Sequence, residues 1–261
     1  MKNQFSIWFI IMLSMVLVAS SGLSQGSKNQ RDEQGRRQGI WQGNYQSGML
    51  RYQGHFVDDK PSGTFRYFYP EGGLRAELHH DPAQVLVPAV YFHKNGEHMA
   101  NGQFKHNQRT GLWRFFSDSG VKLAENEYTD GNLDGKSVTF FASGSVAETV
   151  DYKAGVKKGS WNQFFEDGTL RLDATYENDA LSGPFRLFYE AGGEQLIAHY
   201  ADDLPHGTWK FFTREGELEK EVYYQQGIIV NEIIYIAREE EVTIPLRPDS
   251  EASEDVFTAP F

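Results

Sequence analysis

The residues best suited to chemistry in this sequence are its histidines, six of which lie in one part of the chain. They are His55, His79, His80, His93, His98 and His106. Imidazole nitrogens can hold a divalent metal ion and can exchange protons near neutral pH. A second candidate is the stretch GLWRFFSDSGVKLAENEYTDGNLDG, residues 111–135, which gathers aromatic rings and carboxylates. Whether either group forms a site depends on the elements that position it.

A spacing of 24 residues runs through most of the chain. Eight positions at this spacing hold seven glycines: Gly39, Gly63, Val87, Gly111, Gly135, Gly159, Gly183 and Gly207. Nine residues after each of these, every position is glycine: Gly48, Gly72, Gly96, Gly120, Gly144, Gly168, Gly192 and Gly216. The two columns take 15 of the 26 glycines. Such regularity indicates an internal repeat, in which one supersecondary unit recurs.

The aromatic residues follow the same spacing. Two residues after the first glycine column stand all the tryptophans beyond residue 24: Trp41, Trp113, Trp161 and Trp209. Five residues after it, seven of eight units hold Phe, and 17 residues after it, seven of eight hold Phe or Tyr. Twenty residues after it, seven of eight hold Gly, Asn or Asp, which tolerate a positive φ. The pattern predicts strand, turn, strand and turn in each unit.

A hairpin of 24 residues cannot bury its apolar face alone, so we expect the copies to stack. We predict an all-β fold: an elongated single-layer antiparallel sheet over residues 39–236, made of eight β-hairpin repeats and a closing strand. With strands about 4.8 Å apart, the array would extend roughly 75–80 Å. The two leading aromatic columns have opposite parity. Both faces are therefore aromatic, or a bulge brings these columns to one face.

The pattern G-x-W-x-x-F-x-x-x-G, followed by an aromatic residue and a turn Gly or Asn, resembles the MORN-repeat-variant family of bacterial proteins. Residues 111–135 and the stretch GSWNQFFEDGTLRLDATYENDALSG match it closely, and the resemblance covers residue 35 to about 230. It implies stacked β-hairpins and a binding or scaffolding role, and it brings no catalytic residues. Members of the YwqK type are labelled antitoxin components of toxin–antitoxin systems.

Three further segments flank the repeats. Residues 1–24 have the charged, apolar and small-residue order of a signal peptide cleaved before Gln25, and a retained membrane anchor is the alternative. Residues 25–38 are polar and are expected to be a linker. The acidic tail, residues 237–261, is expected to be disordered, with VFTAPF at its end as an alternative docking peptide.

The repeat argues against the chemistry considered first. His55 and His79 share one repeat phase, so they should lie roughly 10 Å apart, too far for two ligands of one metal. A pairing of His79 with His93 or His98 across strands stays open. The acids recur in turns, as at Asp118 and Asp167, and the sequence contains no nucleophile elbow or phosphate loop. We expect no enzyme, no cofactor and no metal site.

The third unit departs from the repeat in four columns, where it holds His80, Ala83, Val87 and Ala89. Repeats that break the consensus can mark a binding surface, and sequence drift is the alternative. We take His79, His80, Val87, His93 and His98 as a candidate interaction surface.

Composition narrows the function. The chain has a net charge of −11 and no Cys, which argues against nucleic acid as a partner and excludes disulfides and thiolate chemistry. We expect an exported, non-enzymatic repeat scaffold that binds another protein in the cell envelope, with no membrane span left after cleavage. An antitoxin or immunity protein and a glycan-binding platform are the alternatives.

Overall fold

The computed structural model describes residues 27–236, and these form one open antiparallel sheet without helices. Each strand pairs with the next one along the chain, except that the short β16 and then β17 both pair with β15. The predicted all-β, single-layer sheet is confirmed. The segments expected to be a signal peptide (residues 1–24) and a tail (residues 237–261) lie outside the described residues.

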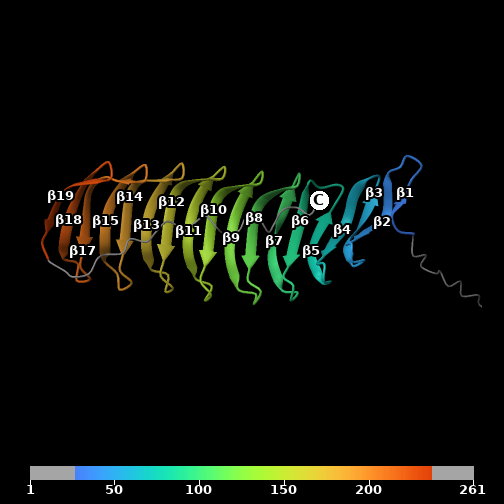
Figure 1. Ribbon diagram of the computed structural model, residues 1–261, viewed down its shortest axis with the longest axis horizontal. Helices are drawn as coiled ribbons and strands as arrows, with labels where there is room; N and C mark the ends of the chain where they lie inside the picture. Colours follow the sequence, from blue (N-terminus) through green and yellow to red (C-terminus); the bar gives the residue numbers. More distant parts are fainter. Residues whose placement is uncertain (1–26, 237–261) are drawn as a thin grey trace, which may run out of the picture.

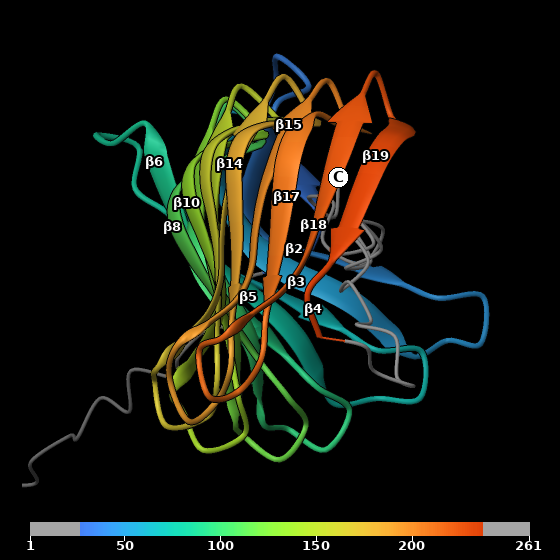
Figure 2. The same ribbon diagram turned by 90° about the vertical axis from the view of Figure 1, so that its left-hand side faces the viewer.

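The first ten strands are β1 (Gln30–Arg31), β2 (Arg37–Asn44), β3 (Leu50–Val57), β4 (Lys60–Phe68), β5 (Leu74–His80), β6 (Leu86–Phe92), β7 (His98–Lys105), β8 (Gln108–Phe116), β9 (Lys122–Thr129) and β10 (Asn132–Phe140). The remaining strands are β11 (Val146–Lys153), β12 (Val156–Phe164), β13 (Leu170–Glu177), β14 (Ala180–Phe188), β15 (Glu194–Ala201), β16 (Leu204–Pro205), β17 (Gly207–Phe212), β18 (Leu218–Gln225) and β19 (Ile228–Ile234). Figure 1 shows them in chain order along one long axis. Figure 2, viewed from the β19 end, shows that the strands turn progressively along that axis.

Two kinds of turn alternate along the sheet. Between β3 and β19, except at the β5–β6 connection, one kind is a two-residue turn with both residues at positive φ, as at Asp130 (48°) and Gly131 (85°), which defines type I′. The other kind is a three-residue turn: the Gly120 amide donates to the Ser117 carbonyl over 3.0 Å, and Gly120 has a φ of 80°. The positive φ expected for the Gly, Asn and Asp column is therefore confirmed.

The first glycine column lies inside a strand and not at a turn. Gly111, with a φ of 66°, belongs to β8. On β7, Asn101 pairs with Arg114 and Gln103 pairs with Thr110, so the chain from residue 111 to 113 stands opposite a single residue. This irregularity is a β-bulge, which adds local twist and needs the left-handed backbone that glycine adopts without strain.

One face of the sheet carries the hydrophobic core. Trp113, Trp161 and Trp209 are at most 2% exposed, so their rings pack inside the array. Buried residues form one cluster between Phe56 and Trp113 and a second between Val150 and Val222. The phenylalanines five residues after the first glycine column are all half-buried, and a register shift precedes each of them.

Opposed positions in neighbouring units have complementary sizes, and we call such a couple a cross-unit pair. Gly54 faces Phe65 so closely that an added Cβ would lie 2.3 Å from the ring. One repeat later the sizes are reversed, because the fully buried Leu78 pairs with Ala89. Ala89 lacks the aromatic ring of the preceding unit, and the larger side chain of Leu78 fills the space.

One more cross-unit pair follows the same rule, and another is polar. Gly102 faces Trp113, and an added Cβ would again lie 2.3 Å from the ring. In the fifth unit, where Ser replaces Trp, Ser137 pairs with Asn126 and donates to its side-chain oxygen over 2.9 Å. A polar pair therefore separates the two core clusters.

The two ends of the sheet differ. At the N-terminal edge, β1 and the beginning of β2 are ordered within the stretch expected to be a linker, because Asn29 pairs with β2. Its amide donates to the Ile40 carbonyl over 2.8 Å, and its side chain exchanges hydrogen bonds with Gln42. At the other edge, every residue of β19 is exposed. Within residues 27–236 no helix is long and apolar enough to cross a membrane.

Candidate functional site

The first two residues of the predicted interaction surface lie on opposite faces of β5. His79 is exposed, and its Nδ1 lies 3.3 Å from the Thr64 hydroxyl on the neighbouring strand. His80 is half-buried, with its ring edge-on to Phe65 at a centroid distance of 5.1 Å. Burial lowers the pKa of His80, and the neighbouring His79 lowers it further, so its ring is neutral near pH 7.

The other three residues have local structural contacts. Val87 is packed against the N-terminal core cluster, and the His98 ring lies 5.2 Å from Phe92. His93 Nε2 contacts the Phe116 carbonyl at 2.9 Å, which is the contact that Tyr45 makes at the equivalent position two units earlier. That tyrosine donates to a carbonyl 23 residues ahead, as His93 does.

The structure does not gather the five residues into one cluster, and their role in binding stays a prediction. Within residues 27–236, no group of three His, Asp, Glu or Cys residues could hold a metal ion. The same unit does have an unusual connection between β5 and β6, which projects beyond the other turns (Figure 2). There Asp81 accepts a hydrogen bond from the Ala83 amide over 2.9 Å, and Val85 is 57% exposed.

A groove of about 590 Å³ lies over the first two units. It combines cationic and aromatic side chains and is lined by Arg37, Tyr45, Arg51, Tyr52, Phe56, Pro61, Phe65, Tyr67 and Arg75. Its volume is within the range of about 300–1,000 Å³ that is usual for ligand sites.

Two arginines of the groove occupy the same position of consecutive repeats, since 75 − 51 = 24. Each lies at a position that the pairing with the preceding strand skips. Tyr52 and Leu50 have partner residues on β2, and Arg51 between them has none. Arg75 is skipped in the same way on β5. A bulge redirects the side chain of its extra residue, so these arginines leave the strict alternation of faces and line the groove.

Among the described residues, these guanidinium groups have no acidic partner. Within residues 27–236 neither Arg51 nor Arg75 forms an ion pair, and Arg75 Nε is buried without a hydrogen-bond acceptor. Arg51 lies over the Tyr52 ring at 5.5 Å. Burial raises the pKa of Tyr67 to about 12, and the positive charge of Arg75 opposes that rise. The phenol therefore stays protonated and can donate a hydrogen bond into the groove.

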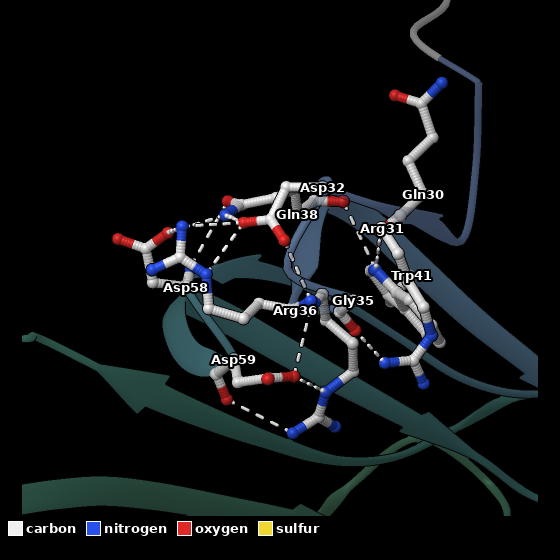
Figure 3. Close-up of polar contacts among 10 residues, drawn as sticks. Gln30, Arg31, Asp32, Gly35, Arg36, Gln38, Trp41, Asp58 and Asp59 are labelled. Atoms are coloured by element: carbon white, nitrogen blue, oxygen red, sulfur yellow. Dashed lines mark hydrogen bonds and ion pairs between the residues drawn. The ribbon is translucent and has the colours of Figure 1, made fainter.

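The third arginine of the groove is held in place. Arg37 Nε lies 2.9 Å from the Asp59 carboxylate, and the guanidinium stacks 3.8 Å from the Phe56 ring centroid. Figure 3 shows Asp59 near Arg36, which contacts Asp32 and Asp58. These ion pairs neutralise the arginines at the edge, and among residues 27–236 they leave Arg51 and Arg75 as the groove's cations without an ion pair.

The sequence prediction missed this groove. Its arginines stand twelve residues after the first glycine column, where the other units hold Met99, Leu123, Ala147, Arg171, Gln195 and Glu219. The change from two consecutive arginines to apolar residues within one column was the available signal. The arrangement offers positive charge, phenol hydroxyls and aromatic walls, which can bind an anionic group.

Comparison with known proteins addresses the repeats directly. The protein-family model described as MORN repeat variant matches residues 37–58 and 205–226. Two of the units match this repeat. Their separation is 205 − 37 = 168 = 7 × 24 residues, so the MORN repeat variant is found in one phase at both ends of the array.

Solved structures give weaker likenesses. The S. aureus TarM mutant in complex with Fondaparinux, alpha-GlcNAc-glycerol and UDP is 16% identical, with a TM-score of 0.28, over 37% of this chain and 19% of that one. A second TarM structure gives 17% identity and a TM-score of 0.27, over 38% of this chain and 20% of that one. The chain therefore spans about a fifth of the length of these structures. A search of curated proteins found none that matches.

Proposed function

We propose that this protein is an exported, non-enzymatic β-repeat scaffold that binds another protein in the cell envelope. The groove supports this proposal: it places several aromatic rings and two guanidinium groups, which have no ion pair within residues 27–236, on a long sheet. Arginine and aromatic residues are the types most enriched at the energetic centres of protein interfaces. Export is proposed from the N-terminal sequence, residues 1–24.

An antitoxin or immunity role would also consist of binding a partner protein, with a toxin as that partner. A neighbouring reading frame of toxin character would favour it. The glycan-binding alternative has less support, because it depended on tryptophan rings facing solvent. Trp113 and Trp161 are at most 1% exposed and offer no free ring face to a sugar.

The proposal can be tested by affinity capture from envelope extract of the source organism, with the full chain as bait. The informative bait is the double variant Arg51→Glu, Arg75→Glu. Arg171→Glu is the matched control, because Arg171 occupies the same bulge position in the sixth unit and does not line the groove. A protein captured by wild type and by the control, but not by the double variant, supports the proposal. Capture of no specific protein by the wild type overturns it.

A further inference from the structure

We infer that the groove over the first two units recognises an extended acidic segment of the partner protein through two carboxylates. This inference rests on the proposed function and specifies the ligand of its groove. The geometry comes first. Arg51 is on β3 and Arg75 is on β5, and β4 lies between these strands. Two strand spacings place their backbones about 10 Å apart.

That separation suits an extended peptide. Side chains two or three residues apart along an extended chain are separated by about 7–10 Å, so two acidic side chains could meet the two arginines. Each guanidinium presents a planar fork of donors that matches a carboxylate. A single compact anion could contact both guanidinium groups only if they converged on it. The backbones of Arg51 and Arg75, however, lie at equivalent positions of consecutive repeats.

The distribution of charge also favours an acidic segment. The chain carries a net charge of −11, yet three acids of the first two units, which contain the groove, already have cationic partners. Asp59 pairs with Arg37, Glu77 with Arg66 and Glu71 with Lys94. Arg51 and Arg75 therefore leave a local positive potential on an acidic protein, which attracts an acidic segment and not a basic one.

The walls of the groove define what stands between the carboxylates. Tyr52 and Tyr67 lie next to each other, with ring centroids 6.4 Å apart. Phe56 and Phe65 lie edge to face at 5.1 Å. Aromatic walls favour an apolar side chain at the intervening position, so the preferred segment alternates acidic and apolar residues.

The test is fluorescence anisotropy of the full chain with a labelled peptide, Gly-Glu-Val-Glu-Val-Glu-Gly, and with its counterpart in which Gln replaces each Glu. We expect the Glu peptide to bind at least tenfold more tightly than the Gln peptide. Arg51→Gln should weaken binding about threefold to tenfold because this residue is exposed. Arg75→Gln should weaken it tenfold or more because this residue is half-buried. Arg171→Gln should leave binding unchanged.

Equal affinity for the two peptides overturns the inference, as does equal weakening by Arg171→Gln. Circular dichroism and the melting temperature confirm folding of each variant, and the exposed Arg51→Gln keeps the test decisive should Arg75→Gln unfold. The rival occupant is the chain's own acidic segment: tighter peptide binding after deletion of residues 237–261 would assign the groove to it. If the peptides fail while wild type and Arg171→Glu capture a protein from extract that the double variant does not, this inference falls and the scaffold proposal stands.

Discussion

The cross-unit pair Leu78–Ala89 allows a quantitative test of how the repeats pack. The preceding unit holds Gly54 and Phe65 at the equivalent positions, because 54 + 24 = 78 and 65 + 24 = 89. The change is therefore Leu78→Gly and Ala89→Phe, made singly and together. The double variant recreates a pair that the protein already contains.

The single changes should be costly. Leu78 is 0% exposed, and removing its side chain should lower the free energy of unfolding by about 3–6 kcal/mol, including the flexibility of glycine in a strand. Ala89→Phe alone would force a ring against Leu78 and should cost about 1–3 kcal/mol. Independent effects would sum to roughly 4–9 kcal/mol.

The double variant should lose less than about 2 kcal/mol, since the ring would fill the space left by the leucine. The assay is urea unfolding followed in parallel by circular dichroism and tryptophan fluorescence, because repeat arrays can depart from two-state behaviour. The reverse exchange, Gly54→Leu with Phe65→Ala, is the control and should show coupling of the same sign. Additivity within about 0.5 kcal/mol in both cycles would refute size complementarity as the packing rule.

Three further predictions follow from single positions. Gly102→Ala should lower the free energy of unfolding by about 1–3 kcal/mol, because the new Cβ would lie 2.3 Å from the Trp113 ring; an unchanged urea midpoint would contradict this. Ala154→Asn should raise the melting temperature, because Ala154 has a φ of 51° in a type I′ turn and Asn tolerates that backbone at a gain of about 0.5–1 kcal/mol. Hydrogen bonding from Gln38 lowers the pKa of Asp32 to about 2. Because the folded pKa lies below the unfolded value, the carboxylate stabilises the N-terminal edge above about pH 4 and this contribution disappears as the pH falls through about 2. NMR should place the Asp32 titration there, and amide protection in β1 should fall with it, whereas Asp32→Asn should show no such step.

The repeat and its turns were predictable because they depend on local backbone chemistry. Residues that tolerate positive φ recur at fixed positions, as at Gly131, and tryptophans recur where the sheet buries them, as at Trp113. The bulges were not predictable from alternation. Gly111 looked like a turn residue and is part of β8, since both environments require the same left-handed backbone.

The groove was missed for the same reason. Strict alternation of faces places Arg51 and Arg75 away from their inward neighbours, and only the bulge brings them to the groove. In the third unit, one of the departures from the repeat has a packing explanation. Its missing aromatic at Ala89 is compensated by Leu78 on the facing strand, and the role of this unit in binding stays a prediction. Comparing the sizes of opposed columns within this one chain would have revealed that compensation.

The constant phase of the array has a consequence for how such a protein can change over time. A duplication or loss of 24 residues would leave each hairpin with an equivalent neighbour. The strands that pair with its two edges would still come from the same positions of the repeat. The distance between the groove and β19 would then change by two strand spacings, about 10 Å, for each unit. A shift of one residue would instead turn every following side chain to the wrong face. The number of units therefore acts as a ruler, which sets in steps how far apart the two ends of the molecule hold whatever they bind.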